Sequence, residues 1–352
     1  MIDAPLINNE DNNFGVSEQV SKLDLIIAQF EVGNGPQIIA STIEGLPDNF
    51  CDELFPSKWE NDSYFIIKTN DLYYFCKCIL AANLITSRGP LQITFALISP
   101  TLLSDDYYQP IIQSVDDLIK SKNSPTFDQN QVHDFLQNLL NNQSNILIRH
   151  PLSLFTNGSF VCSYFQNNPK LLLYLWKARL LGYKIAINSK FSLSKTTDLT
   201  YFLSACSIIP NIEVPFYNDT LFHIDICSDN KIKENWKLCC ITHPILQESI
   251  TADIILNDSG NYIISPDKKW IKKGKGQILN KLRMAFEKLN DKNLLYILIN
   301  LNQSLFNYLR NCNVINSHNI NTIGLDSMNK SFIIQLSSLY NLNCEYESNC
   351  CC

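Results

Sequence analysis

A glycine-rich turn between two apolar runs predicts a β-hairpin near the amino terminus. Residues 25–30 and 37–41 are mostly apolar, and the segment 33–36 between them reads Gly-Asn-Gly-Pro. Glycine adopts positive φ without strain and proline cannot donate a ladder hydrogen bond, so we expect the chain to reverse here. A second tight turn, Arg-Gly-Pro at 88–90, leads into another apolar run at 91–99. These features favour an antiparallel sheet in the first hundred residues.

The periodicity of apolar residues changes near residue 100. Up to that point the period is mostly two, which is the pattern of half-buried strands. Beyond it, helical spacing predicts amphipathic helices at 107–122 and 128–143. Strands followed by helices indicate an antiparallel sheet with helices on one face or at its ends. The expected strands are 24–31, 37–43, 63–68, 72–83 and 91–99, with a packed connecting loop at 47–61.

The second half of the chain alternates helices with short apolar strands, which is typical of an α/β lobe with a largely buried sheet. Loop-forming sequences within 144–168, such as Asn-Gly at 157–158, predict a connection between two lobes. We expect helices at 170–181, 197–208, 277–289, 293–311 and 330–340, strands at 183–189, 221–226 and 238–241, a hairpin at 252–265, and a loop at 266–276.

The expected fold class is therefore α/β (α+β), with an N-terminal antiparallel-sheet lobe followed by an α/β lobe that has C-terminal helices. The first lobe is assigned to residues 23–145 and the second to residues 150–346. Residues 1–22 are polar and carry few aromatic side chains, which predicts disorder. Residues 347–352 form a polar tail that is rich in cysteine.

Charge and cysteine content limit the classes of function. The chain has 28 basic and 34 acidic side chains, so its net charge of −6 argues against nucleic-acid binding. No signal peptide and no bilayer-spanning run is visible, which predicts a cytoplasmic protein whose 13 cysteines are reduced. Cys76 and Cys78 alternate within one expected strand, so we expect both to pack on the same face.

Several motifs, in order along the chain, resemble DENN modules. Residues 171–189 read LLLYLWKARLLGYKIAINS and resemble the helix–strand unit at the centre of DENN domains, where an "LWKALLL" helix leads into a short strand. The strands at 25–41 and 91–99 resemble the first and last strands of the longin-type lobe that opens such a module. The segments 221–226 and 237–242 resemble middle strands of the family, and 321–332 with the tail at 350–352 resembles the end of the short LCHN-type DENN proteins.

The resemblance implies a guanine nucleotide exchange factor for a Rab-family GTPase in membrane traffic. Exchange needs a surface that binds the nucleotide-free switch conformation of the GTPase most tightly. The exchange factor and the nucleotide then weaken each other's binding to the GTPase. It implies no covalent chemistry, no catalytic residue and no cofactor. The alternative is a DENN scaffold without exchange activity that binds a GTPase or another DENN protein. An unrelated α/β enzyme is a third alternative, although no nucleotide-binding loop or nucleophile motif supports it.

Some DENN relatives stimulate GTP hydrolysis with an arginine just beyond the last longin strand. In this sequence the corresponding segment, 100–110, contains no arginine and carries Asp105 and Asp106 instead. An inserted guanidinium would stabilise charge on the transferring phosphoryl group, and this segment supplies none. We therefore do not expect an arginine-finger mechanism here.

Two groups of cations are the candidate partner-binding residues. Lys177 and Arg179 share the helix expected at 170–181 and could face an acidic patch on a partner, or could be solvated. The loop at 268–275 gathers five lysines, of which Lys272 and Lys273 are the candidates for contact with the GTPase or with anionic lipid. A solvated loop without a partner is the alternative for this second group.

The remaining notable side chains are expected to be structural. Trp176 lies on the apolar helix and should be in the core. Two cysteines at 239–240, near His243, have no second ligand pair at zinc spacing, so we expect a buried core and no metal. Cys351 and Cys352 at the end of the chain are the lipidation candidates, and an exposed thiol tail is the alternative. Association with endomembranes would then be peripheral.

Overall fold

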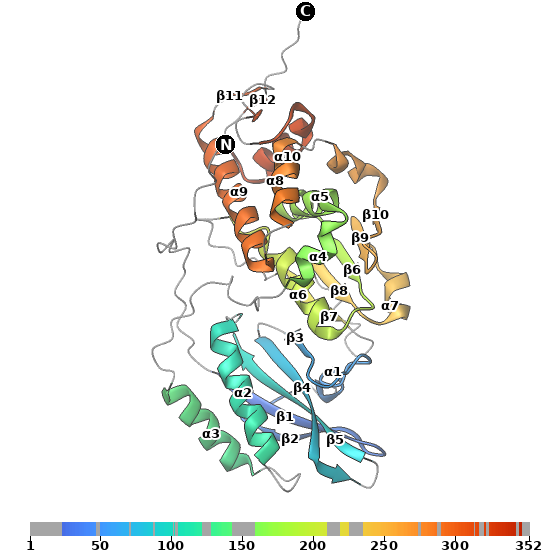
Figure 1. Ribbon diagram of the computed structural model, residues 1–352, viewed down its shortest axis with the longest axis vertical. Helices are drawn as coiled ribbons and strands as arrows, with labels where there is room; N and C mark the ends of the chain where they lie inside the picture. The colour runs from blue at the N-terminus through green and yellow to red at the C-terminus, as the bar shows by residue number, and fades with distance from the viewer. Residues whose placement is uncertain are drawn as a thin grey trace, which may run out of the picture.

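The computed structural model contains two lobes, each built on a five-stranded sheet, that are stacked along the long axis of the molecule (Figure 1). We call residues 23–142 the N-lobe and residues 159–346 the C-lobe. The structure describes residues 23–46, 50–69, 72–86, 89–100, 102, 105–121, 128–142, 159–209, 219–224, 235–273, 276–286, 290–312, 314–316, 320–321, 324–342 and 345–346. The expected disordered segment 1–22 and the tail 347–352 lie outside these residues.

The N-lobe sheet is antiparallel throughout, and its strand order is β2-β1-β5-β4-β3. The first and last strands therefore lie side by side, with Ile27 opposite Phe95. The expected hairpin is confirmed, because β1 and β2 pair antiparallel. Gly33 in the turn and Gly35 at the start of β2 have φ values of 119° and 77°. The strands are β1 (Asp24–Glu31), β2 (Gly35–Ser41), β3 (Tyr64–Thr69), β4 (Leu72–Thr86) and β5 (Gly89–Ser99).

Helices cover both faces of this sheet. Apolar side chains on one face pack with the two amphipathic helices that the sequence predicted, α2 (Asp105–Ser121) and α3 (Gln129–Asn142). The other face packs against the short helix α1 (Phe50–Glu53) and contains Cys76 and Cys78. Both thiols are fully buried on that face, which confirms that they pack together as small apolar groups.

The C-lobe sheet is mixed, with strand order β10-β9-β6-β8-β7. Its central strands are parallel and carry almost continuous apolar sequence, as expected for a sheet that is buried on both faces. The expected hairpin at 252–265 forms β9 and β10, which are antiparallel. The strands are β6 (Ile185–Asn188), β7 (Thr220–Ile224), β8 (Leu238–Ile241), β9 (Ile254–Asn257) and β10 (Tyr262–Ile264).

Most of the C-lobe helices share one apolar core with one face of this sheet. The opposite face packs against Trp236 and α7 (Pro244–Ser249). Two short strands, β11 (Val314–Ile315) and β12 (Glu345–Tyr346), pair near the carboxyl end. The other elements are α4 (Phe160–Gln166), α5 (Pro169–Leu180), α6 (Leu193–Ala205), η3 (Pro266–Lys272), α8 (Gly276–Phe286), α9 (Asp291–Asn311), η5 (Ser327–Asn329) and α10 (Lys330–Leu339).

The fold class is thus mixed α/β, with an antiparallel sheet first and a mixed sheet second, as the sequence predicted. Three expected loops are wrong in part. Helix α1 lies within the loop assigned to 47–61. Helix α4 lies within the connection assigned to 144–168, and a 3₁₀ helix, η3, occupies most of the loop assigned to 266–276. Helix α7 was not expected. Helix α6 begins at Leu193, four residues before the expected start.

Candidate partner-binding surfaces

The junction between the lobes is built where the parallel strands of the C-lobe end. Lys58 of the N-lobe donates hydrogen bonds from Nζ to the carbonyl oxygens of Ser189 (2.6 Å) and Phe191 (3.3 Å). Because β6 ends at Asn188, these carbonyls lie at the carboxyl edge of the sheet. Open α/β sheets bind ligands at this edge. Here a lysine of the neighbouring lobe occupies part of it.

Strand β3 and helix α6 provide a second set of contacts across the junction. The backbone N–H of Tyr64 donates to Ser194 Oγ at 2.9 Å, and the Tyr64 hydroxyl donates to the carboxylate of Asp198. Leu193, the first residue of α6, is buried in the N-lobe core formed by the α1 face of the sheet. The start of α6 is therefore shared by both lobes, which fixes their relative position.

The edge strands β3 and β7 lie next to each other across the junction (Figure 1). Aromatic side chains fill part of this contact. The rings of Phe65 and His223 lie 5.5 Å apart, and those of Tyr73 and Phe222 meet edge-on at 6.5 Å. The two partners of each ring pair lie far apart in sequence. Neither these residues nor Lys58 and Tyr64 could be found from the sequence, because no local pattern indicates which strands of two lobes will meet.

The candidate cations Lys177 and Arg179 are buried, with exposed fractions of 0% and 5%, so a surface position for them is wrong. Lys177 Nζ donates to the carbonyl of Lys273 at 3.0 Å and lies 5.7 Å from the ring centre of Phe332. Arg179 Nη2 pairs with Asp219 Oδ1 at 3.2 Å. The physical reason is that α5 is covered on all sides, since its residues 171–180 are all buried.

Burial has a clear electrostatic consequence for Lys177. Removal of the ammonium group from water lowers the pKa of Lys177 to about 8. The negative charge of Asp326 raises this pKa by a smaller amount. The charged form is therefore less stable inside the C-lobe than in water. This lysine acts inside the lobe, where it joins α5 to the end of η3, and it is not available to a partner.

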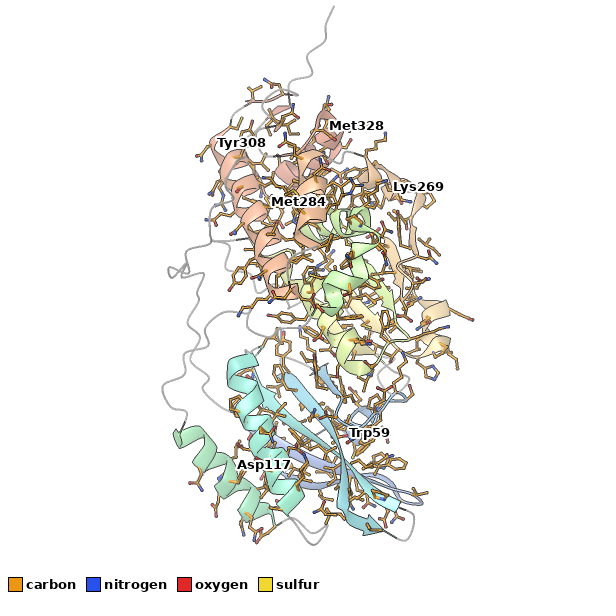
Figure 2. All side chains as sticks on the ribbon, in the orientation of Figure 1. Trp59, Asp117, Lys269, Met284, Tyr308 and Met328 are labelled. Atoms are coloured by element: carbon orange, nitrogen blue, oxygen red, sulfur yellow. The ribbon has the colours of Figure 1, made fainter. Side chains whose placement is uncertain are left out.

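The lysines of η3 are placed differently, since the helix is anchored by apolar residues and presents its cations outward. Ile271 is fully buried, and the half-buried ring of Trp270 meets Tyr183 edge-on at 6.4 Å. Lys272 and Lys273 are exposed, as the sequence suggested. Lys269 is exposed as well, on the outer side of the C-lobe (Figure 2).

An open groove of about 680 Å³ lies beside η3. Most of its lining is apolar and comes from the strands β9 and β10 and from the chain before β9, while Lys269 and Lys272 contribute the charge. Lys272 also lies 4.7 Å from the ring centre of Tyr262 at the edge of β10. The groove and the η3 lysines form the exposed candidate surface on the C-lobe.

The expected core residues are where the sequence placed them. Trp176 is fully buried, and so are the two cysteines at 239–240. Burial raises the pKa of the Cys240 thiol to about 12 and that of Cys78 to about 11, so both stay protonated near neutral pH. Nucleophilic cysteines need a lowered pKa, and these have the opposite shift. Across the described ranges no group of three or more His, Cys, Asp or Glu residues could hold a metal ion.

Other candidates lie outside the described residues. Cys351 and Cys352 belong to the tail, and residues 274–275 are likewise not described. Helix α2 begins at Asp105, in the segment where an arginine finger was considered. None of the helices in the described ranges is long and apolar enough to cross a bilayer. No protein-family model and no curated protein sequence matches the chain.

Proposed function

We propose that the chain is a DENN-type guanine nucleotide exchange factor for a Rab-family small GTPase. The observation that supports this best is the order of the two sheets. An antiparallel sheet with its first and last strands adjacent is followed by an α/β lobe, and the resemblance of the motifs implies this order. The proposed module acts at the surface of endomembranes as a peripheral protein, with Cys351 and Cys352 as its lipidation candidates.

The proposed mechanism uses binding energy alone. A surface that fits the nucleotide-free switch regions better than the nucleotide-bound ones lowers the affinity of the GTPase for GDP by the same factor. Such discrimination requires a difference in affinity for the two states, and a surface of fixed shape can fit one state better than the other. The contacts of Lys58 and Tyr64 across the junction hold the lobes in one arrangement and so favour this mechanism.

The test measures fluorescent GDP release from a panel of Rab GTPases with catalytic amounts of the full chain. Exchange activity predicts faster release from at least one member and tight binding to its nucleotide-free form. Binding without faster release would replace the proposal with a non-catalytic scaffold that binds a GTPase or another DENN protein. Absence of binding across the panel would refute both the exchange factor and the GTPase-binding scaffold, and would leave only a scaffold that binds another DENN protein.

A matched pair of variants tests the role of the junction. K58M removes the ammonium that joins the lobes, whereas K190M removes an exposed ammonium at the same edge of the sheet. We expect K58M to slow stimulated GDP release several-fold and K190M to leave it unchanged. Equal activity of the two variants, both folded by circular dichroism, would show that the junction does not contribute.

A further inference from the structure

Strand β10 is the outer edge of the C-lobe sheet and leaves main-chain groups free. Its pairing with β9 is fixed by the bonds from Asn257 N to Asn261 O (3.0 Å) and from Ser265 N to Asp253 O (2.9 Å). Because alternate residues of an antiparallel strand point to the same side, the N–H and C=O groups of residues 262 and 264 face away from β9. Within the described residues, nothing bonds these four groups.

The groove borders this free edge. Its lining includes Ile263, which points to one face of β10, and Tyr262 and Ile264, which point to the other. The edge between the two faces is therefore accessible from the groove. Ile263 is 69% exposed and lies opposite Ile255 on β9. An exposed apolar edge strand is a ready template for pairing with another chain.

The charge beside the groove indicates which kind of polypeptide segment would bind there. Lys269 and Lys272 line it, and Lys273 follows; in the part of the chain that the structure describes, none of the three has a carboxylate within ion-pair distance. Lys268 is neutralised by Asp267 at 3.1 Å. This concentration of positive charge occurs in a protein whose net charge is −6. Complementary charge steers a partner and fixes its register.

We propose that the β10 edge and its groove bind an extended acidic segment of a partner protein, which adds to the C-lobe sheet as an extra strand. Its main chain bonds to the free groups of residues 262 and 264. Apolar side chains of the segment pack on Ile255 and Ile263, and its carboxylates lie at Lys269 and Lys272. An anionic membrane fits less well, because the surface is concave and the ring of Trp270 packs against Tyr183.

The binding test uses the full chain and a panel of fluorescein-labelled peptides of roughly six residues, in which Asp or Glu alternates with Ile, Val or Leu. Fluorescence anisotropy should detect at least one binder. The double variant K269E/K272E should bind that peptide with an affinity about tenfold lower or more. The control K281E/R283E makes the same charge change at exposed positions on α8 and should leave the affinity unchanged. Hydrogen exchange should slow at the amides of residues 262 and 264 when the peptide is added.

Backbone methylation of the peptide distinguishes strand addition from charge attraction. Two versions carry N-methyl groups on alternate residues, in the two complementary patterns. Strand addition predicts that one pattern abolishes binding and the other is tolerated, because only alternate amides face β10. Equal binding of both versions would overturn strand addition, and full affinity of K269E/K272E would overturn the role of the lysines.

The experiments also distinguish an acidic peptide from the other candidate occupants of this surface, which are a membrane and a second copy of the chain. If no peptide in the panel binds, the proposal is refuted. Capture by phosphatidylserine vesicles that depends on Lys269 and Lys272, without peptide binding, would assign the surface to membranes instead. Concentration-dependent dimerisation that Ile263→Lys abolishes would assign the edge to a second copy of the chain. None of these results bears on GDP release, so peptide binding at β10 and nucleotide exchange are tested independently.

Discussion

Asn302 on α9 joins three segments of the C-lobe, and its removal should destabilise that lobe strongly. The side chain is fully buried. Its Oδ1 accepts a hydrogen bond from Trp176 Nε1 at 2.6 Å, and its Nδ2 donates to the carbonyls of Cys206 (2.9 Å) and Ile208 (2.7 Å). One amide thus connects α5, the end of α6 and α9, with both of its N–H groups in use.

The magnitude follows from what N302A leaves behind. One indole donor and two carbonyl acceptors lose their partner, and each unsatisfied buried group costs about 1–3 kcal/mol. Partial relaxation and water entry reduce the sum, so we expect a loss of about 3–5 kcal/mol in the free energy of unfolding. That is a large part of the roughly 5–15 kcal/mol that stabilises a typical protein.

Urea unfolding, followed by far-ultraviolet circular dichroism and by tryptophan fluorescence, measures this loss. N300A, at an exposed position of the same helix, is the control and should lie within about 0.5 kcal/mol of the wild type. A double-mutant cycle with Trp176→Phe should give a coupling energy of about 1 kcal/mol or more. A loss below about 1 kcal/mol for N302A with an unchanged m-value would refute the reasoning.

Three further predictions use other parts of the structure. Burial lowers the pKa of Lys177 to about 8 from 10.5, so the folded state loses this proton at a lower pH than the unfolded state does. The free energy of unfolding of the wild type relative to K177M should therefore rise by about 1.4 kcal/mol per pH unit between those values. A pH-independent difference between the two proteins in urea unfolding would contradict this. Ala at Gly276 (φ +55°) would place Cβ 2.3 Å from Gly324 O, so G276A should cost more than about 2 kcal/mol, whereas G260A, with similar φ (+74°) and open space, should cost about 1 kcal/mol. Y64F removes the hydroxyl that bonds α6 and should speed hydrogen exchange at the start of that helix, while unchanged exchange would argue against a rigid junction.

Local patterns predicted the elements of the N-lobe well, although both faces of its sheet are covered. The strand expected at 24–31 coincides with β1, and the one at 63–68 differs from β3 by one residue at each end. Strand β4 runs three residues beyond the expected 72–83, past an irregularity in its pairing between Ala81 and Ile85. A periodicity of two breaks at such a point although the strand continues.

Helix α4 was missed because its stabilising partner is distant in sequence. Its first turn contains no acidic residue and its N-cap, Ser159, makes no side-chain bond. The buried carboxylate of Asp291 instead accepts from Val161 N (2.9 Å) and Cys162 N (2.7 Å). A cap supplied from α9 leaves no signal beside the helix, so the segment resembled a loop.

The position of Lys177 and Arg179 was, in contrast, open to prediction. The helix that carries them is apolar around its whole circumference, and such a helix is normally buried. A cation on it must then bond inside the protein, as Lys177 does with the carbonyl of Lys273. The apolar composition of a helix is therefore better evidence for the place of its charges than the charges themselves.

The free edge of β10 could not have been predicted by any local rule. The sequence predicted the hairpin at 252–265, but a hairpin has two outer sides, and either strand could have joined the sheet. Pairing of Ile185 with Ile254 places β9 inside and leaves β10 at the edge. That choice rests on contacts between residues about seventy positions apart. The lysines on η3 become part of a candidate binding surface only because the order of the strands puts them beside unpaired main chain. A surface that depends on strand order can therefore be recognised only in the three-dimensional structure.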